Sequence, residues 1–331
     1  MNDFTEPDLN EFLFRTGLLK RGARAVWTPL AGGVSSDIWR VRLPDKTICV
    51  KRALARLKVK ADWQAPTERN IYEWEWFRFV HKNFPCIVPE PLAHDREMQM
   101  LAMEFLAPED FKVWKTELLK GETDAAFAAQ AGGCLGKIHA KSAFDAALAR
   151  TFATGKIFFA LRIEAYLLAT ARKHQRAAAR IEEIADKTFS AKITLVHGDV
   201  SPKNILIGKE HPVFLDAETA WFGDPAFDLA FCLNHFLLKS AYLRQFAGGY
   251  ADCFKSFAEN YLNQVNWEPR EEIEARTARL LPVLYLARID GKSPVEYITD
   301  ERLKNNIRQA ALGLIERPKA RLLEIADLFT G

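Results

Sequence analysis

The 331-residue sequence predicts an α+β fold in two parts: an N-terminal sheet with one main helix, and a larger, mostly helical C-terminal part. Two observations carry this prediction. In residues 1–105, β-like runs lie on both sides of one strong helix pattern, whereas from Ala107 onward apolar residues recur mostly at helical spacing. The length fits two domains, or one domain with two lobes, at roughly 150 residues each.

In the N-terminal part, a short helix comes first, with Thr5 as its N-cap and with Leu9, Phe12 and Leu13 on one face. The main helix is predicted over residues 66–81. Runs rich in β-branched and aromatic residues predict strands at 25–30, 38–43, 47–52, 91–94 and 98–105.

In the C-terminal part, helices are predicted over residues 125–140, 157–187, 228–259, 270–287 and 301–315. Two short β-like runs, 193–196 and 213–215, interrupt this pattern and bracket the polar segment 197–204. A hinge at about 104–109 is the best candidate boundary, which gives an N-terminal nucleotide-binding lobe of 1–105 and a C-terminal catalytic and acceptor-binding lobe of 106–331.

Composition excludes several classes of protein. The 46 basic and 43 acidic residues give a net charge of +3, too small to indicate nucleic acid or a membrane surface as a partner. The five cysteines form no C-x-x-C pair and indicate reduced thiols. We see neither a signal peptide nor an apolar run of about 18 residues. These features predict a cytoplasmic protein.

The strongest motif is His197-Gly198-Asp199, with Asn204 five residues after the aspartate and Asp216-Ala217-Glu218 further on. Carboxylate and carboxamide oxygens are the ligands that a hard ion such as Mg²⁺ prefers. An aspartate placed just before them can orient a hydroxyl and accept its proton during phosphoryl transfer. The alternative is a plain turn, because Gly, Asp, Ser, Pro and Asn are all turn formers.

Three weaker features precede this motif in the order that a kinase requires. Gly32, Gly33 and Ser35 lie between two predicted strands, where backbone N–H groups can cover phosphates, although a hairpin turn is the default interpretation. Lys51 lies on an apolar strand, where it needs a partner unless it extends to solvent. Glu73 follows on the main helix, where a solvated face is the simpler explanation.

These motifs and their order resemble the aminoglycoside phosphotransferase and choline kinase superfamily over roughly residues 25–300. The most specific parts are 197–199 with Asn204, and 215–218 continuing to 223–229; residues 50–54 and the D-x-E pair are also similar to methylthioribose kinase. The resemblance implies a two-lobed protein-kinase-like fold with an N-terminal antiparallel sheet. It also implies a phosphotransferase with an alcohol group as acceptor.

The resemblance implies roles for individual residues of the C-terminal part. Asp199 would be the catalytic aspartate that positions the acceptor hydroxyl. Asn204 and Asp216 would be ligands of Mg²⁺, with Glu218 in support at the metal or the acceptor. Asp228 would brace the catalytic loop.

For the N-terminal part, the resemblance implies an ATP site. Lys51 would reach the α- and β-phosphates, with Glu73 rather than Glu75 as its ion-pair partner. The Glu104 carbonyl and the Leu106 amide would bind the edge of the adenine.

The sequence also departs from protein kinases, because it has no G-x-G-x-x-G, D-F-G or A-P-E motif. Ser201 stands where their catalytic loop carries a lysine; Lys203 can supply that charge, or can be a surface lysine. These departures argue against a protein substrate.

Candidate residues for the acceptor pocket are Ser201, Trp221, Arg288, Asp290 and Lys292. A helix C-terminus that favours cations explains Arg288 and Lys292 equally well, and Trp221 can simply pack in the core.

Together these features predict a kinase that uses ATP and Mg²⁺ to phosphorylate a hydroxyl of a small polar metabolite, a sugar or an amino alcohol. The expected partners are ATP and that substrate. Two alternatives are an aminoglycoside-resistance phosphotransferase and a non-catalytic nucleotide-binding pseudokinase. A pseudokinase does not need Lys51, Asp199, Asn204 and Asp216 together, and a polycationic aminoglycoside requires an acidic pocket.

Overall fold

The computed structural model describes residues 6–31, 36–54 and 66–329. The chain forms two compact units, Met1–Phe111 and Lys112–Gly331. The functional division at residue 105, with a hinge at about 104–109, stays a prediction.

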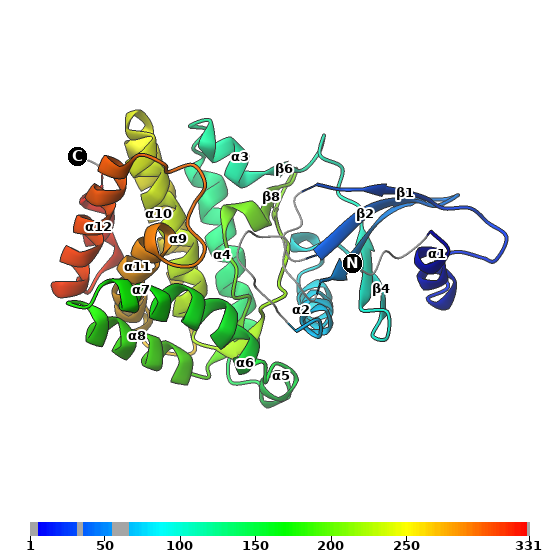
Figure 1. Ribbon diagram of the computed structural model, residues 1–331, viewed down its shortest axis with the longest axis horizontal. Helices are drawn as coiled ribbons and strands as arrows, with labels where there is room; N and C mark the ends of the chain where they lie inside the picture. Colours follow the sequence, from blue (N-terminus) through cyan, green and yellow to red (C-terminus); the bar gives the residue numbers. More distant parts are fainter. Residues whose placement is uncertain (1–5, 32–35, 55–65, 330–331) are drawn as a thin grey trace. The chain divides into compact units, whose positions relative to one another are not determined.

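The N-terminal unit is built on one antiparallel sheet with the strand order β1-β2-β3-β5-β4 (Figure 1). Its strands are β1 (Val26–Pro29), β2 (Ser36–Arg42), β3 (Thr47–Ala53), β4 (Pro91–Asp95) and β5 (Met100–Glu104). Its helices are α1 (Glu6–Arg15), α2 (Arg69–Asn83) and the 3₁₀ turn η1 (Pro85–Ile87). The predicted strands and helices of this unit are therefore present, with ends shifted by a few residues.

Alternation along β3 gives the sheet two different faces. Ile48 and Val50 belong to the same buried cluster as Phe12 and Leu13 of α1. Because successive side chains of a strand point to opposite faces, Lys51 lies on the other face, where it meets α2. The strand pattern thus places Lys51 on the side of the sheet that α2 covers.

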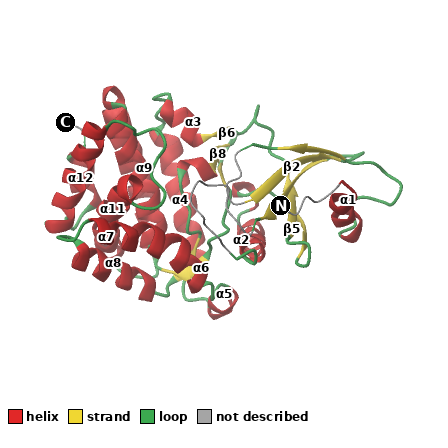
Figure 2. Ribbon diagram, viewed as in Figure 1, coloured by secondary structure: helices red, strands yellow, loops and turns green. Residues whose placement is uncertain are grey.

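The C-terminal unit is mostly helical (Figure 2). Its helices are α3 (Trp114–Leu119), α4 (Ala125–Ser142), α5 (Ala146–Thr151), α6 (Gly155–Phe158), the π-helix η2 (Phe159–Leu168), α7 (Ala169–Lys173), α8 (Ala178–Ser190), α9 (Ala226–Tyr242), η4 (Arg244–Phe246), α10 (Ala247–Leu262), α11 (Arg270–Asp290), α12 (Glu301–Glu316) and α13 (Leu322–Asp327). None of the helices in the described part of the chain combines the length and the apolar character that crossing a membrane requires.

Short strands position the polar segment that follows residue 196. Strand β7 (Thr194–Val196) pairs with β10 (Trp221–Gly223), and β8 (Ile205–Ile207) lies between β6 (Lys112–Val113) and β9 (Pro212–Phe214). The 3₁₀ turn η3 (Pro202–Asn204) leads directly into β8. The loops after β7 and β9 are therefore both anchored by strands.

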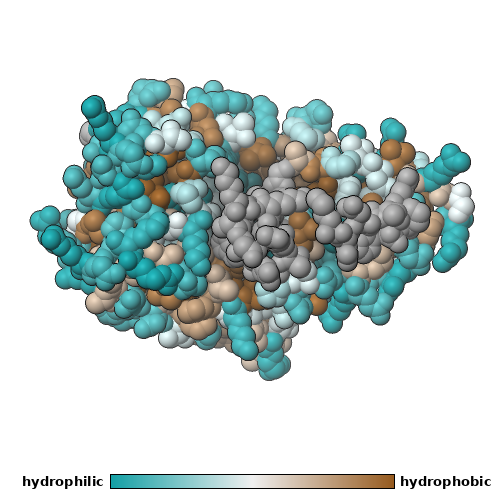
Figure 3. Space-filling model, in the orientation of Figure 1, coloured by the Kyte–Doolittle hydropathy of each residue, from teal (hydrophilic) through white to brown (hydrophobic). Residues whose placement is uncertain are grey.

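Helix α9 is the central helix of this unit, because nearly all of its residues are buried, polar ones included. It packs against α10 and α11, and α10 in turn packs against α4. On the face shown in Figure 3, hydrophilic side chains cover most of the described surface, with hydrophobic ones scattered between them. Such a distribution is ordinary for a chain that buries its apolar residues in a core.

Two helix predictions are wrong in their extent. Residues 157–187 form α6, η2, α7 and α8 instead of one helix, with a break between Lys173 and Ala178. Residues 228–259 form α9 and α10, because the chain leaves the helix at Leu243 with φ −117° and ψ 66°. Neither break contains a glycine or a proline, so both lack the strongest local stop signals of a helix.

The close packing of α4 against α10 yields a first prediction. A Cβ added at Gly132 would lie 2.2 Å from the backbone oxygen of Phe257, whereas one added at Gly133 would meet nothing within 4 Å. We expect Gly132→Ala to destabilise the fold by about 1–3 kcal/mol through overpacking. Gly133→Ala is the matched control and should be neutral or up to about 1 kcal/mol stabilising. Urea unfolding measures both, and equal midpoints would contradict this packing.

A second prediction concerns Lys239 of α9, which is fully buried and has no hydrogen-bond acceptor among the described residues. Burial, with a contribution from Lys115, lowers the pKa of its ammonium group to about 7. The unfolded chain, with an ordinary pKa of about 10.4, therefore binds a proton that the folded chain does not bind between these values. Lowering the pH from 10.4 to 7 consequently decreases the free energy of unfolding of the parent by roughly 1.4 kcal/mol per pH unit.

We expect Lys239→Met to be more stable than the parent at pH 7, with a gain that nearly vanishes at pH 10.4. Lys137→Met, on an exposed position of α4, is the control and should show no such pH dependence. Thermal melts at both pH values test this. A gain that is independent of pH would show that Lys239 keeps an ordinary pKa in the folded protein.

Candidate active site

One buried carboxylate holds the start of the polar segment. Asp228 lies in the first turn of α9 and is completely buried. Its Oδ2 accepts a hydrogen bond from the backbone N–H of His197 at 2.7 Å, and its Oδ1 accepts one from the N–H of Gly198 at 2.8 Å. The ring of His139 adds a third contact at 3.2 Å, and its Nδ1 lies 2.7 Å from the Tyr261 hydroxyl. A helix N-terminus favours a carboxylate at this position.

The backbone conformation at position 198 requires a glycine. Its φ is +80°, a left-handed conformation, and an added Cβ would lie 2.7 Å from the backbone oxygen of Thr219. Any side chain would therefore be strained and would push residues 197–199 away from the loop that follows β9.

His197 connects the two loops that carry the predicted site. The backbone N–H of Asp199 donates to His197 Nδ1 at 3.1 Å, so this nitrogen carries no hydrogen. Its Nε2 donates to the backbone oxygen of Leu215 at 3.0 Å. Burial lowers the pKa of the ring, which keeps it neutral. His197 thus positions Asp199 relative to the segment that leads into Asp216.

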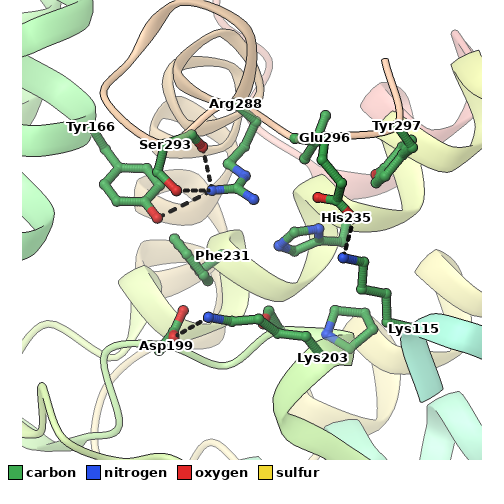
Figure 4. Close-up of a pocket in the computed structure, with 13 residues that line it drawn as sticks. Lys115, Tyr166, Asp199, Lys203, Phe231, His235, Arg288, Ser293, Glu296 and Tyr297 are labelled. Carbon is green, nitrogen blue, oxygen red and sulfur yellow. Dashed lines mark hydrogen bonds and ion pairs between the residues drawn. The ribbon is translucent and has the colours of Figure 1, made fainter. Parts of the chain in front are cut away.

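Asp199 is buried among hydrogen-bond donors and cations. Its Oδ2 lies 2.9 Å from Asn204 Nδ2, 3.0 Å from Lys203 Nζ and 3.3 Å from Arg162 Nη2 (Figure 4 shows the Lys203 contact). Burial opposes ionisation, but the charges of Lys203 and Arg162 outweigh it and hold the pKa of the carboxyl below its usual value. Asp199 is therefore ionised at neutral pH and can accept a hydrogen bond.

Arg162 is the site residue that the sequence did not reveal. It lies on the π-helix η2, and its side chain donates to the backbone oxygen of Gly198 besides contacting Asp199. Burial would lower its pKa, but the charges of Asp199, Glu218 and Asp216 raise it. π-Helical turns are frequent at functional sites, but sequence periodicity places Arg162 on the polar face of an ordinary helix.

The predicted metal ligands lie around Asp199. Asn204 donates through Nδ2 to the backbone oxygen and to Oδ2 of Asp199, at 3.0 and 2.9 Å, which leaves its Oδ1 as an oxygen ligand. Asp216, with φ +65°, and Glu218 are half-buried and follow β9. Among the described residues no group of three or more His, Cys, Asp or Glu forms a metal site. A set of one carboxamide and two carboxylates nevertheless fits a hard divalent ion.

In the N-terminal unit, Lys51 and Glu73 form a buried ion pair with 2.8 Å between Nζ and Oε1. Glu75 instead lies 3.3 Å from Arg78 and 3.7 Å from Arg96, near the surface. The structure thus brings Lys51 to Glu73 and not to Glu75.

The other predicted nucleotide residues are placed only in part. Gly32, Gly33 and Ser35 lie outside the described residues. Glu104 ends β5, and its N–H donates to the backbone oxygen of Glu90 at 2.9 Å. Leu106 follows in irregular backbone and is half-buried.

A pocket in the C-terminal unit opens beside Asp199 (Figure 4). About 410 Å³ of space, open solvent included, lies between its lining residues. Its walls come from five regions that are distant in sequence. The lining residues are Lys115, Tyr166, Asp199, Ser201, Pro202, Lys203, Phe231, His235, Arg288, Ser293, Val295, Glu296 and Tyr297.

Two of the five predicted acceptor residues, Ser201 and Arg288, line this pocket. Trp221 does not, because it is 1% exposed and its ring is stacked between Phe158 and Phe189, with centroids 4.0 and 5.6 Å away. The alternative interpretation, that Trp221 packs in the core, describes its position.

Asp290 and Lys292 also lie outside the pocket lining. Asp290 accepts from His174 Nε2 at 2.8 Å and from the guanidinium of Arg308 at 2.8 and 2.9 Å, so its charge is engaged between helices. Lys292 is exposed and lies 3.4 Å from Glu164. Asp290 and Lys292 thus lie beside Arg288 in the sequence but contact neighbouring helices instead of the pocket.

Solved structures resemble this fold along nearly the whole chain. A choline/ethanolamine kinase family protein from Mesorhizobium loti is 16% identical, with a TM-score of 0.54, and the match covers 96% of this chain and 97% of the other. A choline kinase from Cryptosporidium parvum Iowa II is 12% identical, with a TM-score of 0.54 and coverage of 88% and 90%. Amicoumacin kinase, solved with AMP-PNP and Ca²⁺, is 10% identical, with a TM-score of 0.55 and coverage of 98% and 100%.

At these identities the likeness concerns the fold, and it confirms the predicted protein-kinase-like α+β architecture. No curated protein matches the chain. The sequence model described as the phosphotransferase enzyme family, APH, matches residues 26–263, which is more than two thirds of the chain. The protein therefore belongs to the phosphotransferase enzyme family, as its likeness to aminoglycoside phosphotransferases and choline kinases predicted.

Proposed function

We propose that the protein is a kinase that transfers the γ-phosphoryl group of ATP, with Mg²⁺, to a hydroxyl of a small polar metabolite. The observation that carries this proposal is the ionised Asp199 carboxylate, which lines a pocket of the C-terminal unit and is hydrogen-bonded to Asn204. A phosphotransferase needs a carboxylate in that place, because phosphoryl transfer depends on alignment of the acceptor oxygen.

In this proposal Asp199 accepts the hydrogen bond of the acceptor hydroxyl and takes its proton as the oxygen attacks the γ-phosphorus. Arg162 and Lys203 keep Asp199 ionised, and the Asp228 contacts keep its loop in place. Mg²⁺, bound by Asn204 and Asp216 with Glu218 in support, would neutralise charge on the phosphates.

For the nucleotide, we propose that the buried Lys51–Glu73 pair presents the Lys51 ammonium to the α- and β-phosphates. The backbone at Glu104 and Leu106 would bind adenine, and residues Gly32, Gly33 and Ser35 would cover the phosphates. A buried lysine held by a carboxylate on a neighbouring helix supports this assignment, because the pair fixes the ammonium group without surface screening.

A pseudokinase that only binds nucleotide is the weaker alternative. It needs neither an ionised Asp199 nor the Arg162 and Lys203 charges that keep it so. Measuring ATP consumption with sugars, amino alcohols and aminoglycosides as acceptors separates these functions. Turnover with one acceptor class identifies the kinase, and its absence with all of them, despite nucleotide binding, favours the pseudokinase.

The nucleotide assignment predicts that Mg·ATP stabilises the parent, by about 2.7 kcal/mol at a hundred times Kd. In Lys51→Met the ATP-induced rise in Tm should shrink strongly, whereas Lys46→Met, in the exposed turn before the same strand, should keep it. Lys51→Met leaves Glu73 without this cation, which lowers the Tm of the variant even without ATP. The quantity compared is therefore the ATP-induced rise in Tm within each variant. An undiminished rise in Lys51→Met would refute the phosphate role of Lys51.

The catalytic assignment predicts that Asp199→Asn lowers kcat by at least about a hundredfold, because the base is gone. ATP affinity should stay within a few-fold of the parent, since the proposed role of Asp199 is toward the acceptor. Asp186→Asn, an exposed position on α8, is the matched control and should turn over normally. Normal turnover by Asp199→Asn would move the role of base to Asp216 or Glu218.

A further inference from the structure

The pocket beside Asp199 holds several cations, and two of them are balanced. Lys203 lies 3.0 Å from Asp199, and Lys115 pairs with Glu296. His235 adds no charge, because burial holds its pKa well below the usual value. The charges of these five lining residues therefore sum to zero.

Arg288 is the cation that lacks a counter-charge. Its Nη1 donates to the Tyr166 hydroxyl at 3.2 Å, to Ser293 Oγ at 3.1 Å and to the Ser293 backbone oxygen (Figure 4). None of the three acceptors is a carboxylate, and Arg288 forms no ion pair within the described residues. Burial opposes ionisation of the Tyr166 hydroxyl, but the charges of Arg288 and Arg162 lower its pKa. The Nε of Arg288 is buried and has no acceptor in the described structure. The guanidinium thus has a hydrogen-bond donor that the described residues leave unused.

Other buried polar atoms at the pocket also lack partners. Ser201, which is 1% exposed, has no partner for its Oγ within the described residues, and neither does the Tyr297 hydroxyl. Lys239, the fully buried lysine of α9, lies behind the Tyr297 ring with its Nζ 5.6 Å from the centroid. Buried polar groups are nearly always hydrogen-bonded, so this cluster of donors indicates a ligand rich in acceptor oxygens.

The aromatic faces of the pocket are already occupied by the protein's own cations. Arg162 and Arg288 both lie over the Tyr166 ring, each with its guanidinium carbon 5.7 Å from the centroid. Arg162 also lies 5.8 Å from the Phe231 centroid. A cationic acceptor would need such faces or a free carboxylate, and Arg288 would repel it.

We infer that the acceptor is a hydroxylated small molecule that carries an anionic group, a carboxylate or a phosphate, bound by Arg288 at the end of the pocket away from the reacting hydroxyl. A guanidinium edge matches the two oxygens of either group. This inference rests on the proposed function and narrows its acceptor to a compound such as a sugar acid or a sugar phosphate, in place of an amino alcohol.

The transfer balances with ATP as the only co-substrate. The acceptor oxygen forms a bond to the γ-phosphorus, and the bond from that phosphorus to the β–γ bridging oxygen breaks. The hydroxyl proton passes to Asp199, and ADP leaves with the bridging oxygen. The anionic group of the acceptor takes no part in these bonds and serves to position the hydroxyl.

Binding of inorganic phosphate, without ATP, tests the anion site directly. We expect calorimetry to show that Arg288→Gln raises the dissociation constant by about 10–100-fold, the effect of losing one hydrogen-bonded charge. Arg288→Lys, which keeps the charge, should lose less. Arg279→Gln, on an exposed position of the same helix, is the matched control and should bind like the parent. Equal phosphate affinity in all four proteins overturns the anion site.

Turnover with four acceptors that share one carbon skeleton tests the charge preference of the pocket: glucose, glucosamine, glucuronate and glucose 6-phosphate. Comparing glucuronate with glucose 6-phosphate distinguishes a carboxylate from a phosphate. We expect an anionic member to be preferred, with a KM that rises at least about tenfold in Arg288→Gln while the KM for ATP is unchanged. Preference for glucosamine or glucose overturns the inference and leaves the kinase function standing. Arg288-dependent phosphate binding without ATP consumption by any acceptor, including amino alcohols and aminoglycosides, overturns the kinase function and supports the anion site.

Discussion

The geometry of the polar segment 197–204 depends on the buried Asp228 carboxylate. It accepts hydrogen bonds from two consecutive backbone N–H groups, those of His197 and Gly198, and contacts His139. These contacts connect α9 with the end of β7 and with α4. Because Asp199 follows directly, these contacts also determine its position. Asp228 is thus a positioning residue of the unit.

Two neighbouring regions of the pocket differ in whether their charged side chains have ion-pair partners among the described residues. At Asp199 the negative charge is balanced by Arg162 and Lys203, which keep this buried carboxylate ionised. At Arg288 the hydrogen-bond acceptors around the positive charge include no carboxylate in the described structure. The first arrangement supports the proposed role of Asp199 as the base, and the second supports the proposed anion site.

The residues that carry the proposed chemistry of the site could mostly be predicted from the sequence. The motif predicted that its carboxamide and carboxylates converge, and Asn204 does contact Asp199. The family resemblance implied the pairing of Lys51 with Glu73, and the structure shows this ion pair. The fold class followed from the change of periodicity at about residue 105 and is confirmed by the comparisons.

The pocket could not be predicted in the same way. Its walls come from α3, η2, residues 199–203, α9 and the end of α11 with the segment after it, and no local pattern shows which polar residues face one another. Arg162 of the π-helix η2 donates to the backbone oxygen of Gly198, and apolar spacing does not reveal that contact. Asp290 and Lys292 stand beside Arg288 in the sequence, yet each is engaged elsewhere, by Arg308 and by Glu164.

Hydrogen exchange of the His197 and Gly198 amides tests the role of Asp228 most directly, because it needs no substrate. In the parent both amides should be strongly protected, since each donates to a buried carboxylate. In Asp228→Asn their protection should fall at least about tenfold relative to amides in the middle of α4, whereas Asp186→Asn should change neither. Unchanged relative protection of both amides in a folded Asp228→Asn would contradict the claim that this carboxylate holds the polar segment 197–204.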